Sequence, residues 1–169
     1  MTPAPRGKAT TPLILASVLA IVVLLALELR LLLPLSPSFL WLQLSFTPRA
    51  FGLVVHLWSP AQLAAYRAHL PLDVALLVAY AAFGVLSATR TSWLAPYGRA
   101  ASGLLPLAAL FDLGENALHA WLTEVPRLGV TLPYLLAGTC STLKFAFIGA
   151  FVALWVGAVA RRANGPWPR

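Results

Sequence analysis

Residues 101–122 read ASGLLPLAALFDLGENALHAWL, a run long and apolar enough to cross a bilayer that nevertheless contains ionisable side chains. Its polar members, Asp112, Glu115, Asn116 and His119, are spaced i, i+3, i+4 and i+7. In a helix this spacing places all four side chains on one face. The stretch therefore predicts a membrane-spanning helix whose polar face must meet partners inside the protein.

This polar face is unfavourable in lipid unless it is paired. On the membrane-insertion scale a carboxylate at mid-bilayer costs about 2.5–3.5 kcal/mol, whereas each Leu or Phe contributes only about 0.3–0.6 kcal/mol in favour. Lys144, in the next apolar run of residues 132–160, is the expected partner. It lies about as far from the start of that run as Asp112 lies from the end of this one, so both residues are at a similar distance from the link between the runs. The link between the runs is short, so the two helices are expected to be antiparallel. Lys144 is then predicted to form an ion pair or triad with Asp112 and Glu115.

The composition of the chain supports a membrane protein. Of its 169 residues, 60% are hydrophobic and only 10% are charged, whereas a soluble domain carries about 25% charged residues. Two further apolar runs, about 13–35 and about 70–88, bring the expected number of spans to four. We therefore expect an all-α fold, a four-helix bundle that forms a single membrane domain over residues 1–169.

The segment of about 36–69, between the first two spans, has a different pattern. Apolar side chains recur there at helical spacing, at Phe51, Val54, Val55 and Trp58. Ser59 followed by Pro60 is typical of a helix N-cap and first helical residue. We expect amphipathic helices that lie on the membrane surface and precede a second span starting near Leu70.

The net charge of +7 does not indicate a nucleic-acid partner, because most basic residues flank the expected spans. The N-terminus, the second loop and the C-terminal tail hold seven basic residues, Arg6, Lys8, Arg90, Arg99, Arg161, Arg162 and Arg169, whereas the first and third loops hold Arg49, Arg67 and Arg127. Lys and Arg are enriched in cytoplasmic loops. The sequence therefore predicts a multi-pass protein of the cell membrane with both termini in the cytoplasm and the lipid bilayer as its partner.

Acidic residues are concentrated where a membrane protein can least tolerate them. Four of the five, Glu28, Asp73, Asp112 and Glu115, fall inside or at the edge of expected spans, and such residues mark functional sites by default. The core of the candidate site consists of Asp112, Glu115, Asn116 and Lys144, and Ser141 lies one turn from Lys144. The outward-facing mouth consists of Asp73, Tyr80 and His119, and Glu28 and Arg30 lie in the same outer half. No cofactor and no metal site are predicted, because one helix alone supplies the candidate ligands.

A group of motifs resembles a family of small bacterial four-span membrane proteins. These motifs are LQLSFTP at 42–48, Tyr66-Arg67, Leu72-Asp73, Tyr80-Ala81, LPL at 105–107, FDLGEN at 111–116 and Leu143-Lys144-Phe145. The shared signature is D-x-x-E-N in the third span with a Lys in the fourth. The resemblance covers roughly residues 40 to 150 and implies the same fold and polar site, but no activity.

Three functions stay open at this stage. In the first, the polar pocket binds a small molecule, a lipid headgroup or an ion. In the second, Asp112 or Glu115 is the general acid or base of an intramembrane enzyme with a lipid-soluble substrate. In the third, the chain is a structural subunit in which the ion pairs only lock two helices together. A homo-oligomer is compatible with each of these functions.

Overall fold

The computed structural model describes residues 11–125 and 127–164. Within these ranges the chain is all-helical, with loops and no strand. In chain order the elements are α1 (Thr11–Leu32), α2 (Phe39–Gln43), α3 (Pro48–Leu57), α4 (Pro60–Arg90), the 3-10 helix η1 (Ser92–Tyr97), α5 (Gly98–Glu124) and α6 (Leu132–Asn164). The basic residues Arg6, Lys8 and Arg169, which contribute to the predicted orientation, lie outside the described residues.

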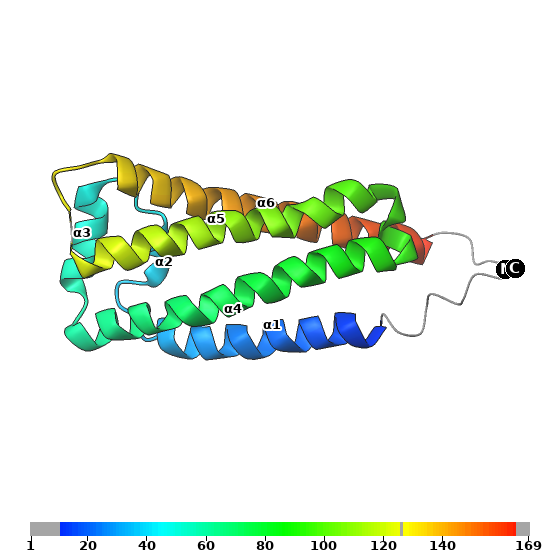
Figure 1. Ribbon diagram of the computed structural model, residues 1–169, viewed down its shortest axis with the longest axis horizontal. Coiled ribbons are helices and arrows are strands. Elements are labelled where there is room, and N and C mark those ends of the chain that lie inside the picture. Colours follow the sequence, from blue (N-terminus) through cyan, green and yellow to red (C-terminus); the bar gives the residue numbers. More distant parts are fainter. Residues whose placement is uncertain (1–10, 126, 165–169) are drawn as a thin grey trace, which may run out of the picture.

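The four long helices run along the long axis of the molecule in alternating directions (Figure 1). α1 packs on α4, α4 on α5, and α5 on α6, so α1 and α6 are the outer members of the row. The short helices α2 and α3 and the α5–α6 link lie at one end (Figure 1). The start of α1, the end of α6 and the α4–α5 connection lie at the other end (Figure 1).

Three of the long helices, α1, α4 and α6, are long and apolar enough to cross a membrane. α5 has a comparable length, but its carboxylates and the neighbouring amide lower its mean hydropathy. Three of the four expected spans therefore meet this requirement on their own sequence. The polar face of α5 is the reason why this helix, unlike α1, α4 and α6, does not meet the requirement by itself.

The second long helix begins earlier than the sequence suggested. α4 runs without interruption from Pro60, whereas we expected a separate surface helix before a span starting near Leu70. Ser59 caps it as predicted: its hydroxyl accepts from the Gln62 backbone N–H at 3.2 Å, and the Gln62 side chain accepts from the Ser59 N–H at 3.0 Å. Pro71 lies inside the helix without ending it, because one buried face, with Tyr66 and Asp73, continues on both sides of it.

The apolar stripe on α3 forms, but the protein itself covers it. Phe51, Val54 and Trp58 are buried in a cluster with residues of α1, α2, α4, α5 and α6. The Trp58 indole donates to the Pro37 carbonyl at 2.8 Å. The stripe from which we expected a helix on the membrane surface is therefore covered by the protein, because the end of the bundle offers enough apolar surface to bury it.

A polar layer separates two apolar clusters of the bundle. One cluster lies near α2 and α3 and includes Tyr66, Leu122 and Tyr134. The other lies in the opposite half and consists of Leu76, Leu77, Tyr80, Leu105, Ala108, Ala109 and Phe151. On α4, α5 and α6 the ionisable residues come between the positions that belong to these clusters. This layer is the candidate site.

Candidate functional site

The centre of the polar layer is an ion triad between α5 and α6. The Lys144 ammonium lies 2.7 Å from Asp112 Oδ1 and 2.7 Å from Glu115 Oε2. The exposed fractions of the three residues are 5% for Lys144, 3% for Asp112 and 0% for Glu115. The predicted triad is therefore confirmed, since the antiparallel helices bring these side chains to the same depth and to facing sides.

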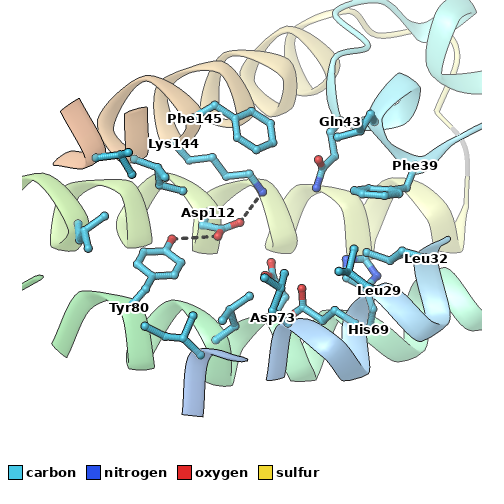
Figure 2. Close-up of a pocket in the computed structure, with 18 of the residues that line it drawn as sticks. Leu29, Leu32, Phe39, Gln43, His69, Asp73, Tyr80, Asp112, Lys144 and Phe145 are labelled. Carbon is cyan, nitrogen blue, oxygen red and sulfur yellow. Dashed lines mark hydrogen bonds and ion pairs between the residues drawn. The ribbon is translucent and has the colours of Figure 1, made fainter. Parts of the chain in front are cut away.

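The triad continues into α4 through the second oxygen of Asp112. The Tyr80 hydroxyl donates to Asp112 Oδ2 at 2.9 Å. Figure 2 shows both contacts of this carboxylate, with Lys144 on one side and Tyr80 on the other. Asp112 is therefore held by two helices besides its own, which fixes the position of its carboxylate.

A second branch of the network runs from Glu115 toward the end of the bundle that α3 covers. His119 Nδ1 lies 3.7 Å from Glu115 Oε1 and 2.7 Å from the Tyr66 hydroxyl. The His119 ring also contacts the Phe51 ring, with centroids 5.5 Å apart. His119 is fully buried and is not among the residues that line the cavity described below. Its expected place at the mouth of a pocket is therefore wrong, because α3 and Tyr66 cover it.

Asp73 joins the network from α4. The Asn116 amide donates to Asp73 Oδ2 at 2.6 Å, so the amide of the D-x-x-E-N stretch pairs with the carboxylate of the neighbouring helix. Next to Asp73 on the same helix, His69 is buried and its Nδ1 contacts the Tyr66 carbonyl. The hydrogen bond between Asn116 and Asp73 pairs two polar side chains that α5 and α4 would otherwise bury alone.

A cavity of about 440 Å³ lies beside the triad. Five helices line it: Ile21, Leu25, Glu28, Leu29 and Leu32 come from α1, Phe39, Leu40 and Gln43 from α2, His69, Asp73, Leu76, Tyr80 and Phe83 from α4, Leu105 and Asp112 from α5, and Lys144, Phe145, Ile148, Phe151 and Val152 from α6. Its polar groups gather in the half toward α2 (Figure 2). The cavity also continues into the opposite half of the bundle, where its lining is apolar.

Two buried acceptors at this cavity lack a hydrogen-bond partner among the described residues. They are Glu28 Oε1 on α1 and Gln43 Oε1 on α2, and each residue is 5% exposed. In Figure 2 the Gln43 side chain extends from α2 toward the space that Lys144 enters from α6. Buried acceptors are almost always paired in folded proteins. The polar end of the cavity is therefore incompletely satisfied by the chain itself.

The remaining predicted residues occupy less central places. Arg30 is exposed on α1 and does not line the cavity. Ser141 is fully buried one turn from Lys144, and its hydroxyl donates to the Ala137 carbonyl at 3.1 Å. In the part of the chain that the structure describes, no cluster of three His, Cys, Asp or Glu residues is arranged to hold a metal ion.

Sequence reasoning left three residues out of the site. His69 could have been found from its position one turn before Asp73, and Tyr66 from the stripe it shares with Leu63 and Leu70. Gln43 carries no such signal, because only the packing of α2 on the bundle brings it to the cavity.

A scan against protein-family models and searches of curated proteins and of solved structures find no match to the chain.

Proposed function

We propose that the chain is a four-span membrane protein that binds a lipid-soluble small molecule in the cavity between α1, α4 and α6. The observation that carries this proposal is a cavity of about 440 Å³ with two unpartnered buried acceptors, Glu28 Oε1 and Gln43 Oε1, in its lining. Ligand pockets are mostly apolar cavities of about 300–1,000 Å³ with a few polar groups that orient the ligand. The lining here has that character.

The packing of α5 supports a fourth span. It lies between α4 and α6, and its carboxylates face Lys144 and the Tyr80 hydroxyl. A helix whose charges are paired inside the bundle presents only its other faces to lipid, where Leu110 and Leu113 are exposed. This arrangement removes the main free-energy cost of placing α5 in a bilayer.

The basic residues support one orientation of the bundle. Arg90, Arg99, Arg161 and Arg162 belong to the end where α1 starts and α6 finishes (Figure 1). Arg49, Arg67 and Arg127 belong to the opposite end, but the sequence of the N-terminus and C-terminal tail adds Arg6, Lys8 and Arg169 to the first group. Since Lys and Arg mark the cytoplasmic side, both termini are cytoplasmic in this proposal. The helices α2 and α3 then cover the non-cytoplasmic end of the bundle, next to the polar half of the cavity.

A purely structural network accounts less well for the cavity. The triad gives Lys144 two carboxylate partners, and Asp112 and Asp73 each have a donor from a neighbouring helix. Glu28 reaches Asp73, but Glu28 Oε1 and Gln43 Oε1 are buried beside this network without a partner among the described residues. Desolvating an acceptor without pairing it costs about 1–3 kcal/mol, which a bound donor would recover.

The experiment is to purify the protein in a mild detergent and to identify retained small molecules by mass spectrometry under non-denaturing conditions. Leu76→Trp places a large ring in the cavity, whereas Leu110→Trp makes the same change on an exposed face of α5. We expect a retained molecule in the unmodified protein and in Leu110→Trp, and its loss in Leu76→Trp. A second filling variant, Leu25→Trp on α1, guards against misfolding of the first. An empty unmodified protein, or retention in both filling variants, contradicts the proposal.

A further inference from the structure

The balance of charge in the cavity restricts what its ligand can be. Glu28, Asp73 and Asp112 are the carboxylic side chains of the lining, and Lys144 is its one Lys or Arg among the described residues. Lys144 is already matched twice, by Asp112 and by Glu115 behind it, at 2.7 Å each. The lining therefore offers acceptors in excess and no unsatisfied cation, which disfavours a phosphate or carboxylate head.

The unsatisfied acceptors lie together at one end of the site. Asp73 Oδ2 receives a hydrogen bond from the neutral Asn116 amide, and the Asp73 carboxyl group lies within hydrogen-bond reach of the Glu28 carboxyl group. Glu28, which lines the cavity from α1 beside Asp73, has one oxygen unpartnered among the described residues, and so does Gln43 on α2. A group with several N–H donors and a positive charge would complement all three. An ammonium group has three donors and no acceptor.

The rest of the cavity is shaped for an apolar body. From Asp73 the lining residues of α4 follow at successive turns, Leu76, Tyr80 and Phe83. At a rise of 1.5 Å per residue this row extends about 15 Å along the helix. Ile148, Phe151 and Val152 line the same half from α6. The polar head and the apolar body of a ligand would therefore lie along the bundle axis, with the head toward α2.

The route into the cavity is indicated by the order of the helices. α1 and α6 both line the cavity, yet they are the outer members of the row, and each packs chiefly on its inner neighbour. Within α1 only Glu28 and Leu32 are buried. The side of the cavity between α1 and α6 is thus the side with the least helix packing, and in a bilayer it faces lipid chains.

We infer that the ligand is an amphiphile with an amine head and an apolar tail, that it enters sideways from the bilayer between α1 and α6, and that Glu28, Asp73 and Gln43 bind its head. This inference rests on the proposed function and adds the chemical class of the ligand. Glu28 has the central role, because it is the carboxylic side chain that α1 brings to the cavity and its Oε1 is unpaired.

The test compares three probes with the same chain, dodecylamine, dodecanol and dodecanoate, by titration calorimetry in a non-ionic detergent. Specific binding is the part that Leu76→Trp abolishes, since amphiphiles also enter micelles. We expect dodecylamine to bind about ten- to a hundredfold more tightly than dodecanol, the range for a hydrogen bond to a charged group, and dodecanoate to bind most weakly.

Variants locate the preference. Glu28→Gln keeps the size of the side chain and should remove most of the preference for dodecylamine while changing dodecanol affinity little. Gln43→Leu should weaken dodecylamine by a smaller factor, because it removes a neutral acceptor. Glu124→Gln is the matched control, since Glu124 is an exposed carboxylate at the end of α5, and it should leave all three affinities unchanged.

Two results would overturn the inference and separate it from the proposed function. If dodecanoate binds as tightly as dodecylamine, or if Glu28→Gln keeps the full amine preference, the amine head is wrong while the cavity still binds amphiphiles. If none of the probes gives binding that Leu76→Trp abolishes and the purified protein retains no molecule, the proposed binding function fails as well.

Discussion

Lys144 allows the most direct test of the ion triad. Lys144→Met removes the ammonium that lies 2.7 Å from each of two carboxylates. At an effective dielectric constant of about 20, each contact at this distance has a Coulomb energy of about 6 kcal/mol before desolvation is subtracted. All three side chains are at most 6% exposed, so water screens little of it. Removing one partner of a buried ion pair costs about 3–5 kcal/mol net, and we expect Lys144→Met to lose that much.

The same reasoning predicts a rescue. Adding Asp112→Asn and Glu115→Gln to Lys144→Met removes the uncompensated carboxylates and keeps the shape of the site. Replacing a whole buried ionic group by well-packed hydrophobic side chains of similar volume is often neutral or stabilising, and the amide substitutions likewise leave no uncompensated charge. The triple variant should therefore be more stable than Lys144→Met by about 2–4 kcal/mol, although it carries two more buried substitutions.

The measurement is the free energy of unfolding in mixed micelles with increasing sodium dodecyl sulfate, followed by tryptophan fluorescence and circular dichroism. Leu136→Met, at an exposed position on α6, is the control and should change the free energy by less than about 0.5 kcal/mol. A triple variant no more stable than Lys144→Met would refute the electrostatic account. So would a Lys144→Met variant as stable as the unmodified protein.

Two further predictions concern packing and topology. Gly84→Ala would place a Cβ 2.7 Å from the Leu105 Cβ and should lower the free energy of unfolding by about 1–3 kcal/mol. The control Gly103→Ala, whose new Cβ meets no atom within 4 Å, should not lower it in the same assay. Equal effects of the two substitutions would show that the close approach of α4 and α5 is unimportant. A cytoplasmic reporter fused after Asn164 should be active and one inserted in the α5–α6 link inactive, whereas the opposite pattern would contradict the proposed orientation.

The ion triad could be predicted from the sequence because its geometry follows from short-range rules. Helical spacing puts Asp112 and Glu115 on one face, and a short link fixes the relative depth of Lys144 on the next helix. Burial in lipid then leaves few alternatives, since an unpaired charge is costly there. These rules need no knowledge of how the other helices are placed, and the structure agrees with them.

The parts that could not be predicted depend on tertiary packing. We expected a separate helix before a span starting near Leu70, but α4 runs on from Pro60 across Pro71 because its buried face extends on both sides of the proline. The stripe of α3 suggested a helix on the membrane surface, whereas other helices of the bundle cover it, since a periodic pattern shows that a face is buried but not what covers it. The cavity and the place of Gln43 in it depend on where α1 and α2 stand relative to α6, which no local pattern encodes.

The pairing of α5 with a later segment has a consequence for biogenesis. In a four-span arrangement the carboxylates of α5 leave the ribosome before Lys144 is made, so α5 enters the insertion machinery while its charges are unpaired. A helix that carries Asp112 and Glu115 is only marginally inserted by itself, whereas α1 and α4 are apolar enough to insert alone. Stable insertion of α5 must therefore wait for α6, and the two helices should integrate together as a hairpin.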